Sequence, residues 1–219
     1  MSRAVIRDSL SISIAVGTYG AAFGVASIAA GLSVVQTCAL SLLLFSGASQ
    51  FAVAGVLGAG GSALSAITTS ALLALRNGFY GARMAPLLRV RGIKRVLASQ
   101  ITIDESTAVA LAHEQKSLDD ARTGFWLTGG GIYLFWNLAT LLGALGADAL
   151  GDPAQWGLDA TIPAAFLGLL WPRLQSNTSR LVAIASVGLA LALTPLLSPG
   201  LPIIACVLIP LIAGWRVRS

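Results

Sequence analysis

The chain has 219 residues, of which 56% are hydrophobic and 11% charged, whereas an ordinary soluble domain has about 25% charged residues. Fourteen Lys and Arg and nine Asp and Glu side chains cannot cover a soluble fold of this length. The composition therefore excludes soluble, disordered and disulfide-stapled secreted proteins, and it predicts an integral membrane protein. The net charge of +5 is explained below by topology, so we expect the lipid bilayer as a partner and no nucleic acid.

The first predicted membrane helix covers residues 9–30, a run of 22 residues without a charge. Arg3 and Arg7 precede it as in a secretory signal, but the run is longer than a signal-peptide core and more membrane segments follow at once. We therefore expect a retained helix. Its small-residue face, from Gly20 to Gly31, is typical of helices that pack closely against another helix.

The second and third apolar runs, residues 33–60 and 62–75, raise the question of whether the number of membrane crossings before the basic loop is odd or even. Basic residues mark cytoplasmic loops, and they are found both at the N-terminus and between residues 83 and 95. Three complete crossings before that basic loop would place it outside. One early segment must therefore fail to cross, and the polar interruption at residues 46–50 identifies the second run. We predict a broken or re-entrant helix there, because irregular backbone at membrane depth occurs only inside protein or beside a watery cavity.

A polar middle, residues 76–122, separates these runs from four more apolar segments. Within it, residues 96–113 contain two acids and are expected to form a partly buried helix that does not cross or is re-entrant. The later segments are predicted at residues 123–147, 161–172, 181–197 and 201–215. The acidic stretch 148–159 is expected outside, and Arg216 and Arg218 place the C-terminus inside. The prediction is one all-α polytopic membrane domain over residues 1–219, with about six crossings and both termini cytoplasmic. A weak similarity between the stretches after Ser49 and after Ile162 indicates an internal repeat.

The polar residues of the interruption are candidate substrate contacts. Ser46, Gly47, Ser49 and Gln50 offer hydroxyls, an amide and flexible backbone, which suit the carboxylate and ammonium groups of a zwitterion. The alternative is that these small and hydroxyl residues only let helices pack closely.

Charged residues at membrane depth are candidates for coupling. Asp104 and Glu105 are adjacent acids in an apolar stretch, where an acid commonly relays protons. A buried carboxyl takes up a proton readily unless a cation such as Arg76 holds it ionised. Alternatively, the acids lie at the interface and pair with the basic residues 89–95.

Three residues lie where the third apolar run ends. Arg76 and Tyr80 share one helix face, Arg76 is placed to pair with Asp104 as a gate, and Asn77 and Tyr80 are further candidate substrate contacts. The alternative for Arg76 is that it extends to the membrane interface.

Catalytic and metal-binding patterns are missing from the sequence. The one histidine, His113, lies in a polar segment away from the apolar serines, and the two cysteines, Cys38 and Cys206, lie far apart in apolar runs. Gly129 to Gly131 lacks the lysine of a phosphate loop. We therefore expect no enzyme, no metal and no cofactor.

Three motifs carry a resemblance to a known family. They are Phe45-Ser46-Gly47-Ala48-Ser49-Gln50-Phe51, Leu75-Arg76-Asn77-Gly78-Phe79-Tyr80-Gly81 with Pro86, and Asp104-Glu105-Ser106. In this order and spacing the chain resembles the AzlC family, the large subunit of bacterial branched-chain amino acid exporters. The resemblance implies a permease of the bacterial plasma membrane that exports leucine, isoleucine, valine and also methionine with a small hydrophobic AzlD-type subunit.

Two other functions remain open from the sequence, a passive channel for a small solute and a scaffold subunit of a membrane complex. A bundle of six short helices has little surface with which to enclose a cavity, so we expect a partner, either the small subunit or a second copy of this chain in a homo-oligomer.

Overall fold

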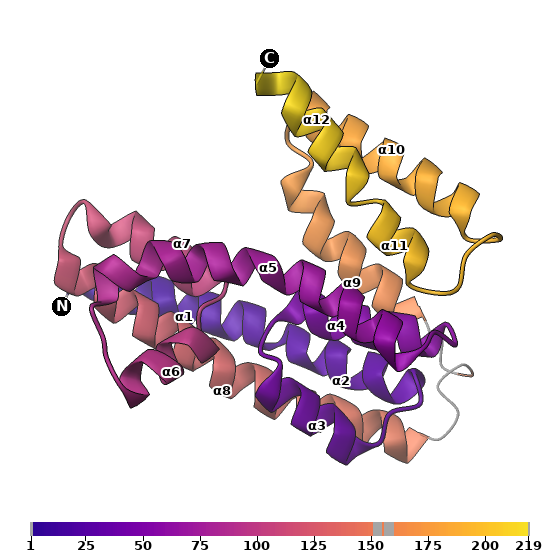
Figure 1. Ribbon diagram of the computed structural model, residues 1–219. Helices are drawn as coiled ribbons and strands as arrows, with labels where there is room; N and C mark the ends of the chain where they lie inside the picture. Colours follow the sequence, from indigo (N-terminus) through magenta and orange to yellow (C-terminus); the bar gives the residue numbers. More distant parts are fainter. Residues whose placement is uncertain (1, 151–154, 156–159, 219) are drawn as a thin grey trace.

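The computed structural model describes residues 2–150, 155 and 160–218, and the regular segments of these residues are all helices (Figure 1). In chain order they are α1 (Arg3–Gly17), α2 (Tyr19–Ala29), α3 (Val34–Leu43), α4 (Gly47–Gly58), α5 (Ala63–Leu88), α6 (Ile93–Gln100), α7 (Asp104–Glu114), α8 (Leu118–Leu150), α9 (Thr161–Leu170), the short 3-10 helix η3 (Trp171–Arg173), α10 (Asn177–Leu193), α11 (Leu201–Ala205) and α12 (Leu208–Arg218). The all-helical fold predicted from composition is confirmed.

Two stretches of the described chain are long and apolar enough to cross a membrane. They are Arg3–Ala29, which combines α1 and α2, and Leu118–Leu150, which is α8. The shorter apolar helices include α3, α4 and α10. Their composition and length support a membrane protein, while the total of six crossings stays a prediction.

Helices α1 and α2 pack along α8 through small residues. A Cβ on Gly24 would lie 2.7 Å from the backbone nitrogen of Ala144, and a Cβ on Gly20 would lie 3.0 Å from the carbonyl carbon of Trp136. The close packing expected of the face that begins at Gly20 is therefore present. Helix α8 therefore covers this part of the face, and no partner protein is needed to cover it.

Replacing Gly143 by alanine is expected to destabilise the protein by about 2 kcal/mol, because overpacking a close helix contact forces backbone to move. Its new Cβ would lie 2.9 Å from the carbonyl carbon of Ala21 and closer still to the oxygen. Gly146→Ala on the same helix is the matched control, since open space surrounds that position. Thermal unfolding in detergent, followed by circular dichroism, should show the loss for Gly143→Ala alone. Equal melting temperatures for the two variants would contradict the observed packing.

Helices α3 and α4 form a hairpin, which we call the first hairpin (residues 34–58). It enters and leaves the bundle at the same end (Figure 1). Helix α3 begins just after α2, and a Cβ on Gly58, the last residue of α4, would lie 3.2 Å from the Cβ of Ala30. Both ends of the first hairpin therefore lie at the C-terminal end of α2. The chain turns back at residues 44–46, so an interruption is present but lies earlier than the predicted residues 46–50, of which 47–50 form the first turn of α4. That the hairpin is re-entrant in the membrane stays a prediction.

Helices α6 and α7 form a second hairpin (residues 93–114), which enters from the opposite end. Helix α6 follows directly on α5, and Glu114 at the end of α7 pairs with Arg83 in the last turns of α5. The predicted partly buried segment at residues 96–113 is thus two helices, with a turn at residues 101–103. The two hairpin tips meet, because Gln100 Nε2 donates to the carbonyl oxygen of Leu42 at 2.9 Å.

Helix α5 is much longer than the apolar run 62–75 predicted. It continues through Arg76 and Arg83 to Leu88 and ends at Arg89, which has a left-handed φ of 51°. The sequence boundary was wrong because it followed the charges, whereas Arg, Leu and Ala are all good helix formers. The predicted basic loop shrinks accordingly, since Lys94 and Arg95 lie in α6.

The N-terminus lies at the same end of the bundle as the basic C-terminal end of α5, where Arg122 Nε of α8 donates to the carbonyl oxygen of Leu87 at 2.9 Å. There the backbone N–H of Ser2 donates to Asp120 at 3.0 Å, and His113 Nε2 lies 3.3 Å from Asp8. Helix α8 runs from this end to the other, where Leu150 lies (Figure 1). Both hairpins return to the end at which they enter, so neither changes the end of the bundle that the chain has reached. The N-terminus and the basic residues after α5 therefore lie at the same end, as the count of crossings requires. Which end faces the cytoplasm stays a prediction.

Residues 151–154 and 156–159 of the acidic stretch 148–159 fall outside the described part of the chain, and they include two of its three acids. These are Asp152 and Asp159, while Asp148 lies in the last turns of α8. The expected position of this stretch outside the cell therefore stays a prediction.

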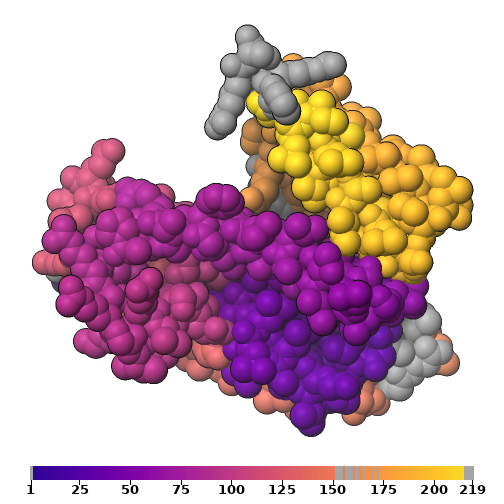
Figure 2. Space-filling view, in the orientation of Figure 1, coloured from indigo at the N-terminus to yellow at the C-terminus, as the bar shows by residue number. Residues whose placement is uncertain are grey.

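Helices α9 to α12 form a C-terminal lobe, orange and yellow in Figure 2, on one side of the bundle. Helix α9 contacts α2 and α4, and Ser65 Oγ donates to the carbonyl oxygen of Pro199 at 2.8 Å. The predicted last segment, residues 201–215, is divided into α11 and α12. The internal repeat stays a prediction.

Candidate functional site

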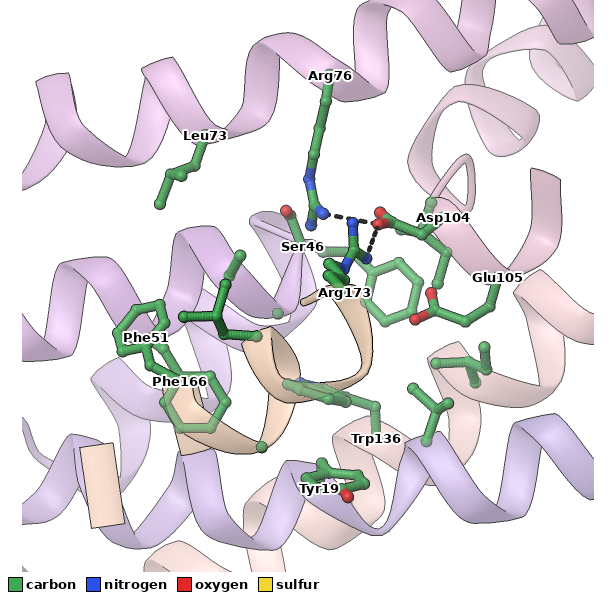
Figure 3. A pocket seen from close by; sticks show the side chains of 18 residues that line it. Tyr19, Ser46, Phe51, Leu73, Arg76, Asp104, Glu105, Trp136, Phe166 and Arg173 are labelled. Carbon is green, nitrogen blue, oxygen red and sulfur yellow. Dashed lines mark hydrogen bonds and ion pairs between the residues drawn. The ribbon is translucent and has the colours of Figure 1, made fainter. Parts of the chain in front are cut away.

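A cavity of about 500 Å³ lies where the two hairpin tips meet (Figure 3). Its walls come from α1, α2, α4, α5, α7, α8, α9 and η3. The lining residues are Val16, Tyr19, Phe45, Ser46, Gly47, Ala48, Phe51, Leu73, Arg76, Ile103, Asp104, Glu105, Ile132, Trp136, Phe166, Gly168, Leu170 and Arg173.

The end of α3 exposes carbonyl groups that no helical N–H can reach. Side chains from three helices satisfy them. Gln50 Nε2 donates to the carbonyl oxygen of Leu44 at 2.7 Å, while Gln100 Nε2 and the hydroxyl of Tyr133 donate to that of Leu42 at 2.9 and 3.1 Å. Hydrogen bonds from side chains of other helices therefore stabilise the break after α3. Sequence reasoning missed Gln100 and Tyr133.

Gln50 and Ser49 lie behind the cavity wall. The Gln50 side chain is fully buried, and its Oε1 accepts a hydrogen bond from Trp136 Nε1 at 2.8 Å. Ser49 Oγ donates to the carbonyl oxygen of Ser70 at 3.1 Å. Neither residue lines the cavity. In this structure both hold the first hairpin in place, and direct contact of either with a substrate stays a prediction.

Ser46 and Gly47 do line the cavity, at the N-terminus of α4. The Ser46 side chain is 4% exposed, and its hydroxyl finds no hydrogen-bond partner among the described residues. The N–H groups in the first turn of a helix have no partner within that helix. At the start of α4 the side chain of Ser46, the residue before the helix, does not cap any of them. This corner of the cavity is therefore suited to an anion.

An ion-pair cluster forms the polar side of the cavity. Oδ2 of Asp104 accepts from Arg76 Nη1 at 2.7 Å and from Arg173 Nη2 at 2.8 Å (Figure 3). The pairing of Arg76 with Asp104 was expected from the sequence. The alternative, in which the acids pair with residues 89–95, is not what the described residues show. Arg173 was missed.

The second acid and its neighbours are placed differently. Glu105 lines the cavity beside Asp104, and the side chain of Ser106 caps α7 by accepting from the N–H of Ile103 at 3.1 Å. Asn77 and Tyr80 do not line the cavity, although Asn77 Oδ1 is buried without a partner in the described structure.

Aromatic rings form the opposite, apolar side. The ring of Phe51 meets that of Phe166 edge to face at 6.0 Å and that of Trp136 at 6.5 Å. Gly47 lets the break approach this wall, because a Cβ there would lie 3.0 Å from the Trp136 ring. The cavity thus offers charges and hydrogen-bonding groups on one side and an apolar surface on the other.

Comparison with known proteins gives consistent results. Residues 11–150 match the family model described as AzlC protein. The chain is 31% identical over 210 residues to the inner membrane protein YgaZ of Escherichia coli, covering 91% of this chain and 83% of that protein. It is 35% identical over 198 residues to an uncharacterized membrane protein of Archaeoglobus fulgidus, covering 88% and 85% of the two chains. No solved structure matches the chain.

Proposed function

The chain belongs to the AzlC family of membrane proteins, and on this basis we propose that it is a permease subunit that exports branched-chain amino acids. The proposed substrates are leucine, isoleucine, valine and methionine, and the proposed membrane is the plasma membrane. Its membership of a membrane protein family without a catalytic pattern supports transport over chemistry.

One observation carries the proposal, namely the two-sided cavity at the hairpin tips. An amino acid at neutral pH has a carboxylate, an ammonium group and a side chain. Arg76 and the hydroxyl of Ser46 suit the carboxylate, an acid suits the ammonium, and the wall around Phe51 suits a branched aliphatic side chain. Irregular backbone at membrane depth is where transporters place their substrates.

The cavity also holds the groups needed for proton coupling. Asp104 and Glu105 are the proposed coupling acids, with Arg76 as the residue that holds or releases them. We further propose an AzlD-type subunit or a second copy of the chain as partner. In support, Leu181 and Ile184 on α10 are 67% and 69% exposed, so this helix offers an apolar surface to lipid or to another helix.

The test is export of labelled leucine, valine and methionine from cells that carry the chain with and without its small subunit. Faster export than in cells lacking the chain is expected, and it should fall when the proton gradient is collapsed. Flux that ignores the gradient would indicate a passive channel. No increase under either condition would contradict the transporter, and absence of any substrate-dependent stabilisation would favour a scaffold.

A further inference from the structure

We propose that Glu105 is the carboxylate on which a proton and the ammonium group of the substrate alternate, while Asp104 is the fixed counter-ion of Arg76 and Arg173. The inference rests on the proposed export of amino acids. It assigns different tasks to two acids that are adjacent in the sequence.

Asp104 is already engaged. One of its oxygens accepts hydrogen bonds from two guanidinium groups, at 2.7 and 2.8 Å, and its side chain is only 16% exposed. It also lies in the first turn of α7, where the helix dipole favours a negative charge. Charge-assisted hydrogen bonds of this length are the strong ones. Asp104 is therefore occupied as the counter-ion of both arginines and ties α5, α7 and η3 together.

Glu105 is free by comparison. It lines the same cavity, and among the described residues its carboxylate makes no hydrogen bond or ion pair with another side chain. Figure 3 shows this carboxylate pointing into the cavity, and no hydrogen bond or ion pair joins it to the two arginines that meet Asp104. A half-buried acid that no other side chain holds by a hydrogen bond or an ion pair is the group in this cluster that can exchange a proton.

The charges of the cavity favour an exchange over joint binding. The charged groups that line the cavity with Glu105 are Arg76 on α5, Asp104 on α7 and Arg173 on η3. Tyr19 on α2 is a further titratable side chain of the lining, and the lining residues of α4, α8 and α9 carry no charge. With Glu105 protonated, the cluster has one net positive charge. With Glu105 ionised it is neutral, and the ammonium group then takes the place of the proton beside the carboxylate.

Each half of the cycle balances. When an amino acid enters from the cytoplasm, Glu105 loses its proton to water, the ammonium group pairs with the carboxylate, and the substrate carboxylate meets Arg76 and the hydroxyl of Ser46. When the substrate leaves on the other side, a proton from that side binds Glu105. One proton moves in for each amino acid that moves out, so a proton gradient drives export.

The experiment measures leucine binding to the purified full-length chain in weakly buffered detergent solution, together with the protons released. Wild-type protein is expected to release up to one proton per leucine, and its affinity should fall by up to tenfold for each unit of decreasing pH while Glu105 is protonated. The keto acid analogue of leucine, 4-methyl-2-oxopentanoate, has no ammonium group and should release no proton. This comparison needs no variant, so it holds even if a substitution fails to fold.

Three variants separate the two acids. Glu105→Gln should bind leucine more weakly, without proton release and without pH dependence, and Glu105→Asp should restore both. Asp104→Asn should keep the pH dependence of whatever binding remains. Glu114→Gln, at the other end of α7 and paired with Arg83 outside the cavity, is the matched control and should behave as wild type.

The possible failures are distinguishable. Leucine binding without proton release, or a pH dependence that survives in Glu105→Gln and disappears in Asp104→Asn, overturns the assignment of Glu105 and leaves export standing. No binding of leucine, valine or methionine to the wild-type chain at any pH, with or without the small subunit, overturns the proposed function itself.

Discussion

Asp104→Asn is expected to lower the free energy of unfolding by about 3 kcal/mol, because breaking a partly buried ion pair leaves a charge without its counter-ion. Arg76 would bear most of this cost. Its side chain is 32% exposed and its Nε already has no partner among the described residues, whereas Arg173 is 61% exposed and can turn to water. Export should fall at least tenfold with stability, since the same cluster forms the polar side of the cavity.

A double-mutant cycle tests the cause. If the loss comes from the unpaired guanidinium, Arg76→Gln combined with Asp104→Asn should be less destabilised than the two single changes predict, by about 1–2 kcal/mol. Asp119→Asn is the control, because this aspartate is 90% exposed and lies 3.7 Å from Arg122 in the first turns of α8. Strict additivity of the Arg76 and Asp104 substitutions would show that the pair is not coupled.

Gln50→Ala is expected to cost about 3 kcal/mol as well, for a different reason. The substitution removes the amide that bonds the carbonyl oxygen of Leu44 and the indole of Trp136, and each buried group left unpaired costs about 1–3 kcal/mol. The first hairpin should loosen at its tip. Leucine binding should therefore fall in parallel with stability, because the wall of the cavity moves.

Thermal unfolding and leucine binding of one protein preparation check this expectation. Gln115→Ala, an exposed glutamine at the end of α7, is the matched control and should change neither property. A Gln50→Ala protein with wild-type stability and no leucine binding would contradict the structural role. That outcome would instead support the direct substrate contact predicted from the sequence.

The sequence was informative where polar residues interrupt an apolar run. Ser46 to Gln50 identified the first break, because irregular backbone and polar side chains at membrane depth are tolerated only inside protein or beside a watery cavity. Parity then required that the first hairpin return to the end at which it enters. The same argument identified the second hairpin but not its turn, since residues 101–103 contain two isoleucines and one threonine and carry no break signal.

The site was predicted only in part, because much of it depends on contacts between distant residues. Arg173 reaches a carboxylate 69 positions earlier, and Gln100 bonds a carbonyl 58 positions earlier. In the sequence each resembles an ordinary polar residue near the end of a helix. Conversely, Gln50 has the chemistry of a substrate contact, and only the fold shows that its amide is already occupied.

Stabilisation by substrate is the sharpest test of whether the cavity binds apolar amino acids. Leucine at one hundred times its dissociation constant should stabilise the purified chain by about 2.7 kcal/mol, and valine and methionine should also stabilise it. Lysine and glutamate should not stabilise it, because placing their charged side chains against the apolar wall around Phe51 would remove the charge from water without a partner. Ala48→Phe, which partly fills the cavity, should weaken the effect, while Ala59→Phe, at an exposed position just after the first hairpin, should keep it. Two results would contradict an amino acid site in this cavity. One is equal stabilisation of the two variants by leucine, and the other is a wild-type chain that leucine, valine and methionine all fail to stabilise.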